Sequence, residues 1–217
     1  MKFVVPFVAA AAVAATASAG FTGFSTVNTT QGDGKVISQV FANFDGGSDT
    51  LLNVFQIAYT GGVGTSGFGV GNFWHADFTN GVAYSQAVGS WNAQLTPGFG
   101  NADSFLTIGG GPGFTNSTNG DPAFGAGYNS AGLVSGGGWF NSNPTNLQGA
   151  NIGGKTLIGQ FVVDAGKGWF VSAKVGYNQG LGTPTVFGEG SFTIGVPAPG
   201  AVALLGLAGL AGRRRRA

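Results

Sequence analysis

The chain contains no cysteine and little charge: Asp, Glu, Lys and Arg make up 8% of its 217 residues, and there is one histidine. Without cysteine no disulfide can stabilise the fold, so the domain must depend on burial of apolar side chains. One histidine and no cysteine also leave too few ligands for a metal site built from nitrogen and sulfur. Between the two ends, no segment carries apolar residues at helical spacing with helix caps.

Positive charge is nearly missing from the middle of the chain. Lys2 lies at the start and four arginines lie at 213–216, which leaves four lysines among all eight acids, a net charge of −4 for residues 20–195. Phosphate binding needs clustered Lys and Arg, so a nucleic-acid partner is not expected. Glycine is abundant instead, at 43 residues or about a fifth of the chain against a usual 7% or so.

The first 19 residues have the layout of a secretory signal peptide. One cation, Lys2, precedes an apolar stretch from Phe3 to Ala15, and Ala17 and Ala19 supply the small residues that signal peptidase requires. The stretch is too short for an ordinary membrane span of about 20 residues. The alternative is an N-terminal core helix, which would show polar residues at helical spacing. We expect cleavage after Ala19.

In the body, several segments of strand length alternate between apolar and polar residues or are apolar throughout, and turn-forming residues separate them. Leu51–Tyr59 is apolar on both faces, which indicates a central strand covered on both sides. The short loop 165–168 predicts a hairpin, with Gly166 or Gly168 at positive φ. We therefore expect an all-β, antiparallel, jelly-roll-like β-sandwich over residues 20–195. The expected strands are Lys35–Phe44, Leu51–Tyr59, Thr156–Asp164, Trp169–Tyr177 and Thr185–Ile194, with shorter ones at Asn72–Phe78, Val82–Val88 and Ser104–Ile108.

Residues 109–149 form a long Gly- and Asn-rich segment with singly placed aromatic residues. Loops of this length are uncommon in compact domains, and isolated aromatic rings argue against a disordered linker. We expect an ordered, irregular excursion anchored by its rings.

Residues 196–212 are uncharged and are followed by Arg213, Arg214, Arg215 and Arg216. As a helix this run would be about 25 Å long, slightly less than the hydrocarbon core of a bilayer. Arginines at one end would hold that end in the cytoplasm and leave the body outside. We expect a C-terminal transmembrane helix that is either retained as an anchor or removed; a solvated polybasic end is the third interpretation.

Pro197, Ala198 and Pro199, the apolar run and the terminal arginines together resemble the PEP-CTERM sorting signal of bacterial envelope proteins, with alanine where that motif has glutamate. The resemblance covers about 22 residues, 196–217. It implies recognition by an exosortase-type transpeptidase and transfer to the cell surface or an extracellular matrix rich in exopolysaccharide. It implies no activity for the body.

Few residues suggest chemistry. His75 lies two residues before Asp77, and an imidazole oriented by a carboxylate can act as a general base or a metal ligand. A histidine with a structural role is the alternative interpretation. Asn43, Asp45 and Asp49 resemble a Ca²⁺ loop that lacks its closing glutamate, or an Asx-type turn. No carboxylate pair, nucleophile elbow or P-loop stands out. No cofactor is expected, and the protein is predicted not to be an enzyme.

Four aromatic residues lie in or beside Gly- and Asn-rich loops: Trp74, Trp91, Trp139 and Phe140, of which Trp74, Trp139 and Phe140 are the candidate sugar contacts. Flat rings flanked by amides suit contact with sugar rings, whereas large aromatic side chains also anchor loops to a core. The sequence thus predicts a secreted envelope or matrix protein with a structural or adhesive role. A module that binds exopolysaccharide is the alternative, and a polysaccharide hydrolase comes third.

Overall fold

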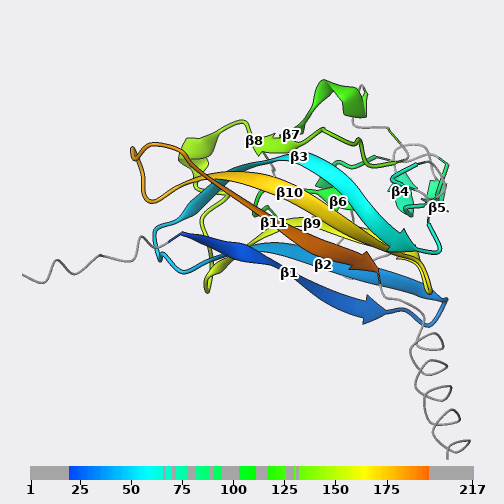
Figure 1. Ribbon diagram of the computed structural model, residues 1–217. Helices are drawn as coiled ribbons and strands as arrows, with labels where there is room; N and C mark the ends of the chain where they lie inside the picture. Colours follow the sequence, from blue (N-terminus) through cyan, green and yellow to red (C-terminus); the bar gives the residue numbers. More distant parts are fainter. Residues whose placement is uncertain are drawn as a thin grey trace, which may run out of the picture.

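The structure is a computed structural model that describes residues 20–65, 67–69, 72–77, 82–87, 90–93, 103–110, 117–125, 130 and 132–195. Over this part the chain is all-β and is built mainly from two antiparallel sheets (Figure 1), which confirms the predicted class. The predicted signal peptide, residues 1–19, and the predicted sorting segment, 196–217, with its transmembrane helix, lie outside the described residues. Within the described ranges no helix has the length and apolar character needed to cross a membrane.

The first sheet has four strands in the order β1-β2-β9-β6. Its central strand β9 is buried along almost its whole length, because the run from Thr156 to Val163 is nearly continuous in apolar residues. Ile158, Phe161 and Val163 belong to the main core between the sheets. Val162, on the other face, packs with Ile37 against Trp74. The strands are β1 (Phe21–Thr30), β2 (Lys35–Phe44), β6 (Phe105–Leu106) and β9 (Lys155–Asp164).

The second sheet has five strands in the order β11-β10-β3-β8-β7. Along β10, buried Trp169, Val171, Ala173, Val175 and Tyr177 alternate with residues on the outer face. Its strands are β3 (Thr50–Val63), β7 (Thr118–Gly120), β8 (Trp139–Asn141), β10 (Gly168–Asn178) and β11 (Val186–Gly195), and a separate two-stranded sheet pairs β4 (His75–Asp77) with β5 (Val82–Ser85).

The predicted hairpin between β9 and β10 is wrong. β9 pairs with β2 and β6, whereas β10 pairs with β3 and β11, so the loop at 165–167 carries the chain from one sheet to the other. Gly166 does take a positive φ of 85°. The reason is burial: β9 is apolar on both faces and takes the centre of one sheet, while β10 needs only one covered face.

β3 is central in its sheet, as predicted, but its outer face is not fully covered. Register shifts opposite β10 place an extra residue in β3 near Leu52 and near Gln56. Leu51, Val54 and Ile57 therefore point into the core, at a spacing of three rather than two. Phe55 is left half-buried on the outer face.

β1 was not among the expected strands, and it closes one side of the sandwich. It lies against the edge strand β11, where the rings of Phe21 and Phe24 lie over Gly188 and Gly190. Thr26 Oγ1 donates a hydrogen bond of 2.9 Å to the backbone carbonyl of Thr193. The two edge strands therefore cover each other.

Within 109–149 the described parts are ordered around two buried rings. Phe124, in the 3₁₀ turn η2 (Pro122–Phe124), and Trp139 both lie in the core. A second turn, η4 (Pro144–Asn146), follows β8. The predicted anchoring by rings is confirmed for these two residues and is wrong for Phe140, which is 44% exposed; Phe114 and Tyr128 lie outside the described residues.

The described body begins and ends at opposite ends of the sandwich (Figure 1). Gly20 lies beside the Tyr177 side chain, whereas Gly195 lies beside Gly168. These two neighbours are nine residues apart on β10, which corresponds to about 30 Å. Ser38 Oγ accepts a 2.8 Å hydrogen bond from the Gly195 backbone N–H and fixes the chain where it leaves the body.

Candidate functional site

His75 is completely buried and lies edge-on to Trp91, with ring centroids 4.4 Å apart. Its Nδ1 lies 3.1 Å from the Ser104 backbone carbonyl, so Nδ1 donates and Nε2 is unprotonated. Nε2 makes no regular hydrogen bond with the described residues. Burial lowers the pKa of His75 to about 4, opposed by the backbone groups of Ser104 and Ser90. The neutral ring is therefore enclosed, away from solvent.

The carboxylate that neighbours His75 in the structure is Asp103, which the sequence did not single out. Asp103 is buried, and its Oδ1 lies 4.0 Å from His75 Nδ1. The side chain of Asp77, the predicted partner, lies outside the described parts of the molecule. Among the residues described, no three His, Asp or Glu side chains gather closely enough to hold a metal ion.

Asn43, Asp45 and Asp49 each bond to separate protein groups. Asn43 Oδ1 accepts from Ser25 Oγ at 2.9 Å, and Asp45 Oδ1 accepts from the Gly20 backbone N–H. Asp49 Oδ2 accepts from the Gly46 N–H at 3.2 Å; this bond runs back to the third residue before Asp49, whereas an Asx turn bonds to the backbone two residues on. Burial, aided by nearby Asp45, raises the pKa of Asp49. The three side chains thus hold the turn between β2 and β3 and its contact with Gly20.

Trp74, Trp139 and Phe140 do not come together. Trp74 lies on the outer side of the four-stranded sheet, where its Nε1 donates to Asp164 Oδ1 at 2.8 Å and Lys35 Nζ lies 4.7 Å from its ring. Hydrogen bonds from Trp74, Lys167 and Gln86 outweigh burial and hold the pKa of Asp164 below its usual range. Trp139 points into the core, and Phe140 points out from the other sheet.

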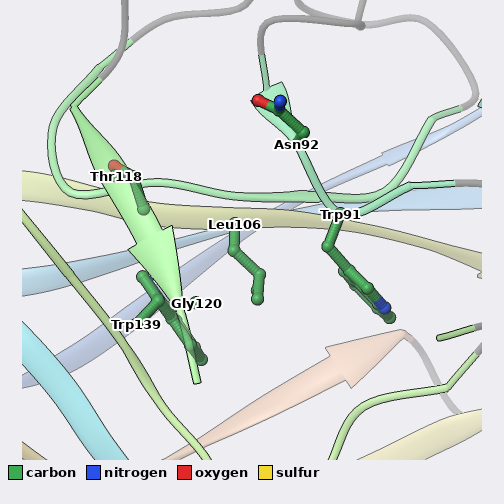
Figure 2. A pocket seen from close by; sticks show the side chains of 6 residues that line it. All are labelled: Trp91, Asn92, Leu106, Thr118, Gly120 and Trp139. Carbon is green, nitrogen blue, oxygen red and sulfur yellow. The ribbon is translucent and has the colours of Figure 1, made fainter. Parts of the chain in front are cut away.

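Trp139 is 1% exposed, and its Nε1 donates a 2.9 Å hydrogen bond to the Thr107 carbonyl. Figure 2 shows Trp139 and Trp91 on opposite sides of a small cavity, with Leu106 between them. The cavity lies where β6 of one sheet approaches β7 of the other, beside Thr118 and Gly120. None of the described residues that line it is charged, so it has the features of a packing gap between sheet edges.

A hollow of about 330 Å³ lies on the outer face of the five-stranded sheet beside Phe140. Its floor contains the glycine run 136–138, which lies against β3: the Gly136 N–H donates to the Ile57 carbonyl at 2.7 Å. A Cβ at Gly138 would come within 2.3 Å of the Val54 carbonyl oxygen. The side chains around the hollow are Asn53, Phe55, Gln56, Asp121, Pro122 and Phe140.

Phe140 and Asn53 are direct cross-strand partners in this hollow and share the outer face. Phe140 is 44% exposed. Asn53 Oδ1 is buried but has no hydrogen-bond partner in the structure as described. Of the predicted aromatic residues, Phe140 therefore lies in a formed site, together with Asn53, Phe55 and Gln56. No sequence pattern indicates these three residues, because the bulges that turn them outward depend on pairing with β10.

Comparison with known proteins gives no relative: no family model, no curated protein and no solved structure matches the chain. The predicted sorting residues Pro197, Ala198, Pro199 and Arg213–Arg216, and the predicted cleavage residues Ala17 and Ala19, lie outside the described residues.

Proposed function

We propose that the protein is exported and acts on the cell envelope or in the extracellular matrix, in a structural or adhesive role without catalysis. Signal peptidase would remove residues 1–19, and an exosortase-type transpeptidase would recognise 196–217. The membrane contact would be made through the C-terminal helix. The body would be a jelly-roll-like sandwich, since the chain passes repeatedly from one sheet to the other.

The observation that carries this proposal is the placement of Gly20 and Gly195 at opposite ends of the body. Attachment through the C-terminal segment would leave both outer faces and the far end, with its loops at 45–49 and 179–185, open to the surroundings. Exposed apolar side chains lie at that end, with Leu181 78% and Ile152 82% exposed. A body held at one end and open elsewhere suits adhesion.

The proposal is tested by locating the full chain and a variant that ends at Gly195 in fractionated cells. We expect the full chain at the surface or in the matrix, and the shortened chain in the periplasm or medium. Intact-mass measurement of the surface form decides between cleavage and a retained anchor, since a mass that includes Arg213–Arg216 contradicts cleavage. Finding both forms in the cytoplasm with residues 1–19 attached overturns the proposal.

A carbohydrate-binding module is the second candidate function. The hollow beside Phe140 favours it, since it combines a ring that is 44% exposed with the amide groups of Asn53 and Gln56. For the third candidate, a polysaccharide hydrolase, the described residues offer no comparable support.

A further inference from the structure

We propose that the outer face of the five-stranded sheet binds a neutral polysaccharide in the hollow beside Phe140, with Phe140 stacking on a sugar ring and the amides of Asn53 and Gln56 contacting its hydroxyl groups. This inference deepens the proposed function, because it names the ligand class and the face for an adhesive role outside the cell.

The aromatic rings form the apolar part of the site. Phe140 and Phe55 both line the hollow, and Phe55 lies edge-on to Phe187 at a centroid distance of 5.9 Å. Phe187 is 65% exposed. Gly176 lies between Phe187 and Asn53 in the strand ladder and adds no side chain. The C–H groups on one side of a pyranose ring suit the negative face of such aromatic rings.

The side-chain oxygen of Asn53 is a hydrogen-bond acceptor without a donor among the described residues. Its Oδ1 is buried without a donor, although buried amide oxygens are nearly always paired. A Cβ at position 176 would lie 2.6 Å from this oxygen, so glycine leaves the room that the amide occupies. A small shift of the side chain toward the hollow would bring the oxygen to a hydroxyl donor, which a sugar provides in number.

Gln56 has a backbone conformation with positive φ, which is unfavourable for a non-glycine residue. Its φ is +50°, and the other non-glycine residue with positive φ among those described is Leu147, at +57°. Such conformations carry a free-energy cost for non-glycine residues and concentrate at functional positions. Gln56 is exposed, and it borders both the hollow beside Phe140 and a second hollow of about 400 Å³ over β10 and β11. A sugar chain lying across the strands would pass this amide.

The charges around the two hollows disfavour an acidic ligand. Asp121 lines the first hollow, and Lys174 and Glu189 line the second, so acids outnumber bases. The body as a whole carries four lysines against eight acids. An acidic polymer would be repelled rather than held. Amides and hydroxyl groups match the hydroxyl groups of a neutral sugar in both donors and acceptors.

The test is native affinity electrophoresis of the full chain in gels that contain dextran, mixed-linkage β-glucan, galactomannan or xyloglucan, with alginate as the anionic comparison. We expect retardation by at least one neutral polymer and none by alginate. Phe140→Ala and Asn53→Ala should each weaken binding by roughly three- to tenfold, the range for loss of one ring contact or one hydrogen bond.

Phe170→Ala is the matched control, since Phe170 is also 44% exposed on the outer face of the same sheet but lies near the Gly168 end of β10. It should keep the affinity of the unchanged protein. No retardation by any of the four neutral polymers, binding to alginate alone, or an equal loss in Phe170→Ala overturns the inference.

A second pair of variants separates binding from folding. Gln56→Gly removes the amide and relieves the positive φ, so the melting temperature should rise while binding falls. Leu147→Gly relieves the same kind of conformation away from the hollow, and it should raise the melting temperature with binding unchanged. If Gln56→Gly binds as well as the unchanged protein, Gln56 has no part in the site. Cell fractionation reports on export separately, so a surface protein that binds no sugar refutes this inference alone.

Discussion

At the residue scale, the burial of His75 links the stability of the fold to pH. His75 is neutral in the folded state because burial lowers its pKa to about 4, whereas in the unfolded chain it titrates near 6.5. Between these values the unfolded chain binds more protons than the folded one. The stability from the neutral ring is therefore complete above pH 6.5 and is lost as the pH falls toward 4.

We expect the free energy of unfolding of the unchanged protein to fall by about 3 kcal/mol more between pH 6.5 and 4 than that of His75→Gln. Glutamine does not titrate, so the difference between the two proteins isolates the histidine from the buried Asp49, whose raised pKa acts in the opposite direction. Urea denaturation at a series of pH values measures this. Parallel pH profiles for both proteins would show that His75 is not the source.

At the scale of elements, the sequence patterns predict where the strands lie better than they predict which strands pair. The alternation of 35–44, the apolar run of 156–164 and the pattern of 169–177 correspond to β2, β9 and β10. Pairing depends on burial summed over whole sheets, so the loop at 165–167 looked like a hairpin yet crosses between sheets. β1 was missed because its residues are largely exposed and its two rings are only partly covered, by β11, which lies more than 160 residues away in the sequence.

The same reasoning applies to the candidate site. The Gly- and Asn-rich neighbours of Phe140 make it a candidate, but the direction of its side chain follows from the pairing of β8 with β3. Trp139, next to it, points the other way and serves the core. Adjacent residues on a strand face opposite sides, so local sequence suggests a pair of rings without saying which one is accessible.

The contact between β1 and β11 gives a test at this scale. A Cβ added at Gly188 would lie 2.5 Å from Phe21 Cδ1, so Gly188→Ala must displace the ring. We expect a loss of about 1–3 kcal/mol in unfolding free energy, the usual cost of overpacking. Gly47→Ala is the control, since nothing lies within 4 Å of its added Cβ. Thermal melting compares them, and equal melting temperatures would mean that β1 tolerates the change.

At the scale of the whole molecule, the absence of cysteine allows the orientation of the body at the cell surface to be tested experimentally. Leu181→Cys places a thiol at the end far from Gly195, and Gly32→Cys places one in the turn that contacts the loop at 165–167 near Gly195. In intact cells a membrane-impermeant maleimide should label Leu181→Cys readily. Gly32→Cys should react several-fold more slowly if the C-terminal segment is attached to the membrane, because access near the attachment is restricted.

In released protein both thiols should react at similar rates, which controls for intrinsic reactivity. Equal labelling in intact cells would contradict attachment through the C-terminal end. No labelling of either variant in intact cells, with full labelling after lysis, would contradict export.

The pairing of β2 with β9 has a consequence for how the chain matures. Gln39 and Gln160 contact each other across 121 residues of sequence. β3 likewise pairs with β10, which is synthesised much later. Neither large sheet is complete until the last third of the polypeptide has been synthesised, and such distant pairings form slowly. If the chain is exported as proposed, it would thus remain unfolded long enough to pass through a narrow translocation channel, and the sandwich would assemble only on the far side.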